Sequence, residues 1–410
     1  MSTGTYDTTT FAKSLREFFD EETIAALNRP TAEATGLPGS TYCSPEFLEL
    51  ERELLFSKTW VAAAMASEVL SPGDVKPVNV AGLPLVFTRA KDGVIHCFQN
   101  ICRHRGAALV TESQSNCRVL RCPWHSWTYE LDGRLRGTPD VGGAEQHWAQ
   151  GICPEKLGLI PVRVEQWFDF LFVNLDGQAP PLEQHLAPLL KRLSQFDFSR
   201  LHYAGTWNHH YDANWKISVA SAIEDYHLPW LHPQIAGGQR RAYQPSIEWS
   251  SGCYYAVFQA LLEFRAGGGL DDPDLPTLPL MPGLAGPDSC STSFVNVFPT
   301  GILGVAPDYV YAGVWLPDGP GRTTLAFHFY YVDEGAFADK FRPVREHIVK
   351  RAQEVFTQDS AVLKSVQERA PYRIHKDLRN RYSTYWEGAV HQFERQIANA
   401  MLEAAGQARG

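Results

Sequence analysis

Two short stretches of the sequence each place one cysteine and one histidine close together. Cys102 and His104 have one residue between them, and Cys122 and His125 have two. Seventeen residues separate His104 from Cys122. Thiolates are soft ligands and imidazoles are borderline ones, and together they suit zinc or an iron–sulfur centre. The sequence therefore predicts a metal centre held by two thiolates and two imidazoles.

The order of the four residues distinguishes these two kinds of centre. Structural zinc sites usually pair cysteine with cysteine and histidine with histidine. Here each stretch mixes the two, as a Rieske 2Fe–2S centre requires, with Cys102 and Cys122 on one iron and the histidines on the other. The stretch also resembles the Rieske motif of ring-hydroxylating oxygenases, including the Arg105-Gly106 that follows the first histidine. Trp124 could shield the sulfides from water. A zinc-stabilised binding protein is the remote alternative.

A second set of candidate ligands follows Asn214. That segment is expected to begin as a helix with Glu224 and His227 on one face. His232, five residues later, would lie well off that face in an unbroken helix, but Pro229 favours a break before it. After the break His232 can lie beside His227 as a second metal ligand. Two histidines near a helix end can equally be ordinary hydrogen-bonded residues.

A third ligand is expected on a long helix predicted over about 342–369. Its apolar stripe recurs at three- and four-residue spacing, at Ile348, Ala352, Val355, Val362 and Val366. Asp359 occupies the stripe position between Val355 and Val362. A carboxylate on a buried face is costly unless it is paired or coordinated. A salt bridge is one explanation, and the other is the 2-His-1-carboxylate triad of non-haem iron enzymes.

The second set resembles the mononuclear-iron motif of Rieske non-haem iron oxygenases, which reads acid-x2-His-x4-His. Glu224, His227 and His232 are in register with it. The third ligand of that family comes from the C-terminal helix, which agrees with Asp359. The resemblance to the α (catalytic) subunit covers the chain from about residue 42 to 367. It implies a Rieske cluster and a mononuclear Fe(II) in the same chain.

The surrounding sequence predicts the elements that must hold these ligands. Short apolar strands with turn signals such as Asp92-Gly93 fill about 60–175 and indicate a small all-β domain. Longer strands near 294–332, followed by the long helix, indicate an antiparallel sheet in the remainder. The expected fold class is α+β. The resemblance implies an inserted all-β Rieske domain and a helix-grip-type catalytic domain with a long C-terminal helix.

We expect three segments along the chain. Residues 1–41 form an N-terminal helical segment that packs on the catalytic domain. Residues 42–177 form the Rieske domain, and residues 178–410 form the catalytic mononuclear iron domain. Within the last, about 266–288 is rich in Gly, Pro and Asp and is expected to be a mobile loop.

Composition limits the possible partners. The chain has 410 residues, with 37 Lys and Arg against 46 Asp and Glu and a net charge of −9. This balance argues against nucleic acid or an anionic membrane as partner. No apolar run approaches the roughly 18–20 residues of a membrane span, and no secretory signal is visible. We expect a cytoplasmic protein.

The resemblance implies a terminal oxygenase that uses O2 and electrons from NAD(P)H. The sequence contains no G-x-G-x-x-G fingerprint and no plant-type ferredoxin cysteine run. A separate flavin and iron–sulfur reductase must therefore supply the electrons. Family members assemble as homotrimers, in which the acid at the position of Glu224 bridges the iron site to a cluster histidine of the neighbouring subunit, here His104 or His125.

The type of bridging acid indicates the substrate. Arene dioxygenases typically carry Asp there, whereas Glu224 is similar to the branch that acts on carnitine, betaines and other quaternary amines. This implies a monooxygenase that hydroxylates or N-demethylates a small cationic amine. A quaternary ammonium binds well in an aromatic cage, and the chain has 11 Trp, 16 Tyr and 22 Phe. The alternative is an arene or aromatic-acid ring-hydroxylating oxygenase.

Overall fold

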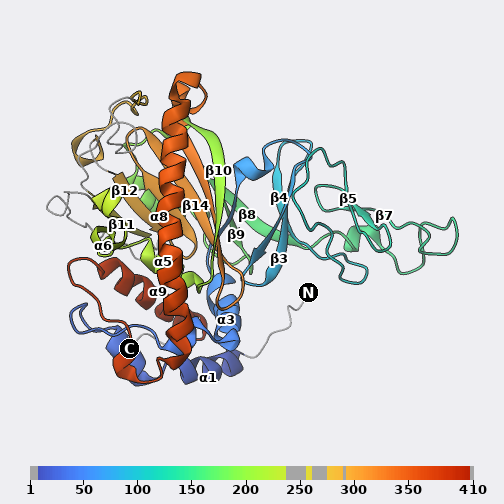
Figure 1. The fold of residues 1–410 in the computed structure, drawn as a ribbon. Helices are drawn as coiled ribbons and strands as arrows, with labels where there is room; N and C mark the ends of the chain where they lie inside the picture. Colours follow the sequence, from blue (N-terminus) through green and yellow to red (C-terminus); the bar gives the residue numbers. More distant parts are fainter. Residues whose placement is uncertain (1–7, 237–254, 261–274, 290–291, 407–410) are drawn as a thin grey trace. The chain divides into compact units, whose positions relative to one another are not determined.

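The computed structural model describes residues 8–236, 255–260, 275–289 and 292–406 (Figure 1). Contacts divide the chain into two compact units, Ser57–Leu182 and a second made of Met1–Phe56 with Glu183–Gly410. The inserted domain was predicted from the sequence to begin at residue 42. In the structure the π-helical turn η2 (Arg52–Phe56) contacts α9 (Gly388–Ala404), which places residues 45–56 with the second unit.

The inserted unit is built from short antiparallel strands. Six of the described strands form one sheet, in the order β1 (Val61–Met65), β9 (Phe170–Asn174), β8 (Pro161–Trp167), β4 (Ile95–Gln99), β3 (Leu83–Arg89) and β2 (Val75–Val80). Three more form a small sheet of β5 (Leu120–Arg121), β6 (Thr128–Tyr129) and β7 (Leu135–Gly137). Ala81 and Gly82 join β2 to β3 with φ of +49° and +92°, and positive φ at both positions characterises a type I′ hairpin turn.

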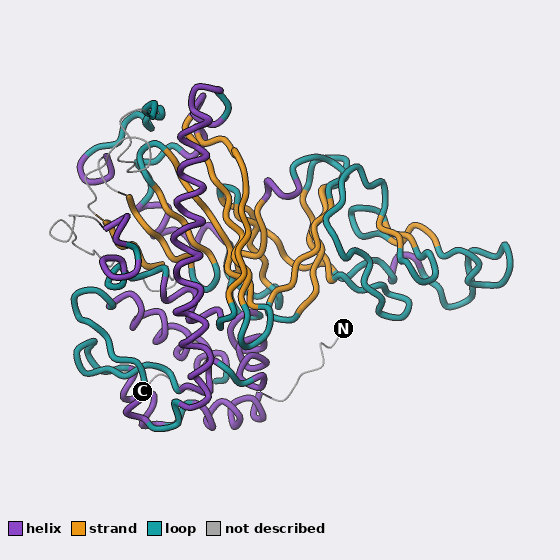
Figure 2. The backbone as a smooth tube through the Cα atoms, in the orientation of Figure 1, coloured by secondary structure: helices purple, strands orange, loops and turns teal. Residues whose placement is uncertain are grey.

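The second unit contains a larger antiparallel sheet. Its described strands follow the order β10 (Leu201–Tyr211), β15 (Thr323–Val332), β14 (Tyr309–Pro317), β13 (Gly301–Val305), β12 (Thr292–Val297) and β11 (Tyr255–Ala260). The long helix α8 (Arg342–Arg369) runs along one face of this sheet (Figures 1 and 2). The predicted α+β class, with an antiparallel sheet and a long helix in the last third of the chain, is confirmed.

Aromatic rings join α8 to the sheet. Phe356 of α8 packs on Phe327 of β15, with ring centroids 4.8 Å apart, and on Trp207 of β10 at 6.0 Å. Tyr211 donates its hydroxyl to the carbonyl oxygen of Phe356 at 3.1 Å. Aromatic pairs of this kind add stability beyond the area that they bury. They fix the turn of α8 that precedes Asp359.

The N-terminal segment packs on α9. It forms two helices, α1 (Thr8–Phe18) and α2 (Glu21–Leu27), which are separated because Asp20 caps the second through the Thr23 N–H at 2.7 Å. Glu394 of α9 is 2% exposed and accepts four hydrogen bonds, which satisfy its buried charge. The donors are Leu37 N, Tyr42 Oη, Asn380 Nδ2 and Tyr382 Oη.

Short helices and one irregular segment complete the second unit. The helices are α3 (Pro45–Glu51), α4 (Leu182–Arg192), α5 (Trp215–Ser221), α6 (Leu228–Leu231) and α7 (Pro233–Ala236). Part of the loop predicted at 266–288 lies outside the described residues, and its described part contains only the start of a 3-10 turn (Gly286–Ser289). None of the described helices has the length and apolar character to cross a membrane.

Candidate metal centres

The four cysteine and histidine candidates lie on two loops with the same backbone geometry. In each loop the cysteine N–H donates to the carbonyl oxygen five residues later, and the N–H four residues after the cysteine donates back to the cysteine carbonyl. These distances are 2.8 and 3.0 Å around Cys102, and 2.8 and 3.1 Å around Cys122. The fourth residue has a positive φ in both loops, +79° at Gly106 and +59° at Ser126. Each loop therefore turns back on its own cysteine.

The chemistry of these four side chains fits a Rieske cluster. Both cysteines are 2% exposed, and the rings of His104 and His125 lie with centroids 4.7 Å apart. Burial raises the pKa of the Cys102 thiol, and the neighbouring Cys122 adds to this, so thiolates here need a compensating cation. Among the described residues, His125 Nδ1 is buried without a hydrogen-bond partner. Because such atoms nearly always have a partner, an iron ligand is a fitting role for this nitrogen.

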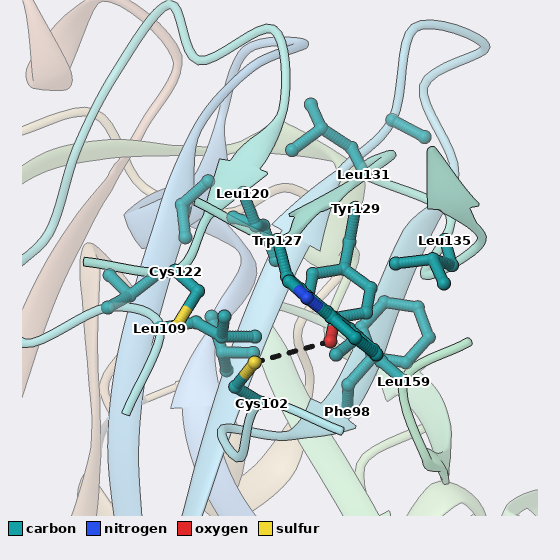
Figure 3. Packing of buried hydrophobic residues seen from close by; sticks show 14 residues of the cluster. Phe98, Cys102, Leu109, Leu120, Cys122, Trp127, Tyr129, Leu131, Leu135 and Leu159 are labelled. Carbon is teal, nitrogen blue, oxygen red and sulfur yellow. Dashed lines mark hydrogen bonds between the residues drawn. The ribbon is translucent and has the colours of Figure 1, made fainter. Parts of the chain in front are cut away.

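The side chains around the loops orient the candidate ligands (Figure 3). Tyr129 is fully buried, and its hydroxyl accepts a hydrogen bond from the Arg103 N–H at 3.0 Å. Its own proton is therefore free to point at Cys102 Sγ, which lies 3.4 Å away. Trp127, 2% exposed, stacks on His104 with centroids 4.8 Å apart.

Trp127, and not the Trp124 that was predicted to shield the sulfides, is the buried tryptophan of the second loop. Trp124 is 52% exposed, and the Arg105 guanidinium lies 4.1 Å from the centre of its ring. Trp127 is the buried aromatic residue of the second loop. Trp124 instead presents an apolar surface beside His125, at a centroid distance of 4.6 Å.

The segment with the second candidate set folds differently from the expected helix. α5 ends at Ser221, and Glu224 lies in an irregular stretch before α6. His227 precedes α6, and His232 follows it. Pro229 lies in the first turn of α6, where proline is tolerated, rather than at a break in a longer helix. A single four-residue turn therefore brings the two histidines to the same side.

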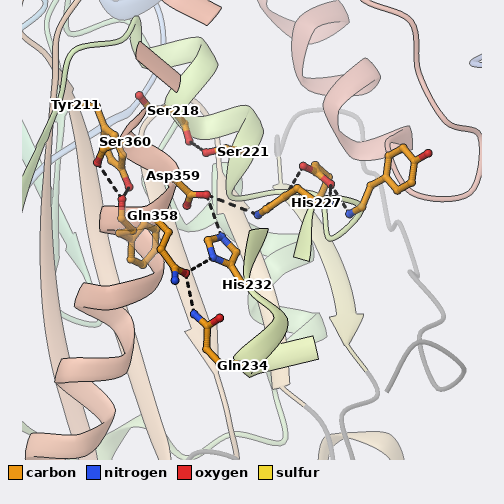
Figure 4. A network of polar contacts seen from close by, with 12 residues as sticks. Tyr211, Ser218, Ser221, His227, His232, Gln234, Gln358, Asp359 and Ser360 are labelled. Carbon is orange, nitrogen blue, oxygen red and sulfur yellow. Dashed lines mark hydrogen bonds and ion pairs between the residues drawn. The ribbon is translucent and has the colours of Figure 1, made fainter. Parts of the chain in front are cut away.

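His227, His232 and Asp359 come together as predicted from the sequence (Figure 4). Their potential ligand atoms all lie within 4.8 Å of one another. Asp359 Oδ1 is 2.9 Å from His232 Nε2 and 3.9 Å from His227 Nε2. Within the described part of the chain, the ion-pair partners of Asp359 are these two histidines and no arginine. Two imidazoles and one carboxylate fit the triad of a mononuclear iron site.

Asp359 is buried as the apolar pattern predicted, but the pattern itself was partly wrong. Val362 and Val366 are 46% and 37% exposed, and the buried face of α8 continues through Leu363 instead. Ile348 lies on the predicted stripe and is buried. Asp359 itself is 5% exposed and lies four residues before Leu363, one helical turn away on the same face.

The Nδ1 atoms of His227 and His232 each have a hydrogen-bond partner. Glu224 Oε1 lies 2.5 Å from His227 Nδ1, and Gln358 Oε1 lies 2.7 Å from His232 Nδ1. Burial lowers the pKa of His227, but the hydrogen bond and charge of Glu224, with Asp359, raise it more, so the net shift is upward. Gln358 was not predicted as a site residue, because its adjacency to Asp359 is the only signal that the sequence contains.

Comparison with known domains identifies two matches in the chain. The sequence model of the family described as the ring hydroxylating alpha subunit (catalytic domain) matches residues 198–403, half of the chain. The model of the Rieske [2Fe-2S] domain matches residues 59–148. Each range contains one of the two candidate ligand sets.

Curated relatives and solved structures agree with these matches. The glycine betaine monooxygenase oxygenase subunit of Chromohalobacter salexigens is 34% identical over 199 residues, 48% of this chain and 43% of that protein. The carnitine monooxygenase oxygenase subunit of Acinetobacter baumannii is 34% identical over 201 residues, 48% of this chain and 53% of that protein. The chain thus matches about half the length of these relatives. A solved quaternary ammonium Rieske monooxygenase has the same fold, with a TM-score of 0.75 at 22% identity over 92% of this chain and 98% of that one.

Proposed function

Because this chain belongs to the ring-hydroxylating alpha-subunit family, we propose that it is the terminal oxygenase of a Rieske-type monooxygenase acting on a small quaternary amine. The observation that carries the proposal is the convergence of His227 Nε2, His232 Nε2 and Asp359 Oδ1 in a chain that also holds a Rieske domain. The triad would hold Fe(II). Cys102, His104, Cys122 and His125 would hold the 2Fe–2S cluster.

The two sets of ligands indicate different chemical roles for the two metal centres. A cluster held by the cysteine and histidine set would supply single electrons, and Fe(II) held by the triad would supply the chemistry of O2 activation for hydroxylation. A separate NAD(P)H-dependent reductase would deliver the electrons, because the sequence lacks a dinucleotide-binding fingerprint. In this chain Glu224 holds His227 by its Nδ1, which leaves Nε2 directed at Asp359.

We also propose a homotrimer in which Glu224 carries electrons from the cluster of the neighbouring subunit. Each unit presents large apolar side chains to solvent close to its candidate ligands. Trp124, beside His125, is 52% exposed in the inserted unit. Tyr226 and Trp230, which flank His227 in the sequence, are 49% and 73% exposed in the second unit. Exposed aromatic residues of this kind are typical of protein–protein interfaces.

A cluster of aromatic rings in the second unit supports the proposal of a cationic substrate. The Tyr311 ring of β14 packs on Phe327 with centroids 5.1 Å apart, and Phe327 packs in turn on Phe356, one turn before Asp359. Tyr311 keeps part of its surface accessible although β14 is a central strand. Burial raises the pKa of Tyr311, and the Asp225 carboxylate, which also acts on His227, adds to this shift. Aromatic faces with a nearby carboxylate suit a quaternary ammonium.

The test is turnover by the purified chain with a Rieske oxygenase reductase and NADH. Glycine betaine and carnitine should each be compared with a neutral isostere in which a tert-butyl group replaces the trimethylammonium. We expect oxygen uptake with stoichiometric product, either formaldehyde or a hydroxylated amine, from the cations only. Equal turnover of the isostere, or cis-diol formation from an aromatic acid, would refute the amine assignment and favour an arene oxygenase.

A further inference from the structure

The two candidate histidine ligands differ in the group that holds their second ring nitrogen. His227 Nδ1 faces the carboxylate of Glu224 at 2.5 Å, whereas His232 Nδ1 faces the amide oxygen of Gln358 at 2.7 Å (Figure 4). His232 is the more enclosed of the two, with no exposed surface. Its orientation therefore depends on a neutral side chain rather than on a charged one.

A second glutamine is hydrogen-bonded to the same atom of the Gln358 amide that faces the imidazole. Gln234, in α7, donates its Nε2–H to Gln358 Oε1 at 2.7 Å. The same oxygen lies 2.7 Å from His232 Nδ1. An amide NH2 group is a donor only, so the atom that it meets must be an acceptor. Since the oxygen of Gln358 faces both groups, His232 Nδ1 carries the proton and donates it.

We propose that Gln358 is the positioning residue of His232. By accepting the Nδ1–H, it leaves Nε2 unprotonated and available to bind Fe2+ together with Asp359 Oδ1, which lies 2.9 Å away. Metal-bound imidazoles generally need such a partner for the other ring nitrogen. The proposal rests on the mononuclear iron site proposed above and adds a residue to it.

The choice of an amide has an electrostatic consequence. The site already contains two carboxylates, Asp359 and Glu224, beside its two imidazoles. Gln358 orients His232 without adding a further negative charge. A glutamate at position 358 could accept the same Nδ1–H and would make the imidazole a more basic ligand. A leucine of similar size could accept no hydrogen bond.

The first measurement is Fe2+ affinity of the full-length protein with its cluster assembled, by competition with a chromophoric chelator. We expect Gln358→Leu to weaken Fe2+ binding about 10–100-fold, the usual cost of losing such a partner. Gln358→Glu should bind as tightly as wild type or more tightly. Gln353→Leu, the same substitution on the same helix, is the matched control and should bind as wild type. Thermal unfolding and the cluster spectrum verify that each variant folds.

The second measurement separates positioning from packing. With the cluster oxidised, nitric oxide added to the ferrous site gives an S = 3/2 EPR signal whose rhombicity reports the ligand geometry. This signal should change in Gln358→Leu and return towards wild type in Gln358→Glu. Gln234→Leu should weaken binding less than Gln358→Leu, because only the orientation of the amide is lost.

Each failure has a distinct meaning. Wild-type affinity and an unchanged signal in Gln358→Leu would overturn the role of Gln358 while leaving the site intact. A loss in Gln358→Glu as large as in Gln358→Leu would also overturn it, because the hydrogen bond would not be what matters. Wild-type Fe2+ binding by Asp359→Ala would instead refute the proposed iron site itself.

Discussion

The two candidate centres of this chain are held in place by different kinds of interaction. Around Cys102 and Cys122, each loop closes on itself through two backbone hydrogen bonds that span four or five residues. The histidine–carboxylate site joins His232 to Asp359 across 127 positions of sequence, through a helix that reaches it only because α8 packs on the sheet. The first centre is therefore a local construction, and the second depends on tertiary packing.

Because the two centres are held by different interactions, loss of metal from one centre should leave the other centre loaded. The largest effect is expected for Cys102→Ser and for His125→Ala, which should lose the visible absorption of the cluster completely, because each removes a ligand. Metal analysis should still find Fe2+ bound at the triad. Retention of the full cluster spectrum in either variant would refute the assignment of that ligand.

Removal of the Asp359 carboxylate tests the centre that depends on tertiary packing. Asp359→Ala should abolish turnover and strongly weaken Fe2+ binding, since it removes the one carboxylate of a three-ligand set. The cluster spectrum should remain unchanged. Unaltered mononuclear iron content would favour a structural hydrogen bond between Asp359 and His232 over the ligand role.

The same contrast explains which features the sequence could predict. The paired Cys and His stretches carry their geometry in local spacing, so four ligands were found directly. The helix expected to reach His227 ends at Ser221, because helical propensity is a weak guide that tertiary context overrides. Gln358 contacts His232 across 126 positions, and no local spacing encodes that contact.

The stripe on α8 shows a second limit. A helical face can continue at either three or four residues, and only the surface packed against it decides between them. Asp359 was correctly predicted to be buried, because it precedes the point at which a three-residue and a four-residue spacing lead to different residues. The next residue was not, since Leu363 rather than Val362 turned out to be buried.

Glu224 connects the comparison to function, because it holds a ligand of one centre and is proposed to reach the other centre in a neighbouring subunit. Glu224→Gln should keep both metal centres but slow cluster reoxidation, followed at the cluster absorption when pre-reduced protein meets substrate and O2. We expect the rate of cluster reoxidation to fall about 10-fold or more, because the amide cannot provide the charge that supports the Nδ1–H of His227.

The control for that variant must be an exposed acid. Asp225, next in sequence, is buried and acts electrostatically on His227, so it does not qualify. Glu354 of α8 is exposed and lies 3.9 Å from Lys350, a pair of little energetic value. Glu354→Gln should reoxidise at the wild-type rate. Wild-type reoxidation in Glu224→Gln would mean that electrons reach the triad by another route.

The smallest effect should come from tuning the local centre without breaking it. In Tyr129→Phe the ring that packs in the core remains, and the hydroxyl 3.4 Å from Cys102 Sγ is lost. A hydrogen bond to sulfur stabilises the reduced, more negative cluster, so its loss should lower the reduction potential. A contribution of about 1 kcal/mol corresponds to a decrease of about 40 mV for one electron. Redox titration of the cluster EPR signal measures this shift directly, and the Fe2+ affinity of the triad should not change. A potential equal to that of the wild type would mean that the Tyr129 hydroxyl holds the first loop only through the Arg103 N–H and does not act on the cluster sulfur.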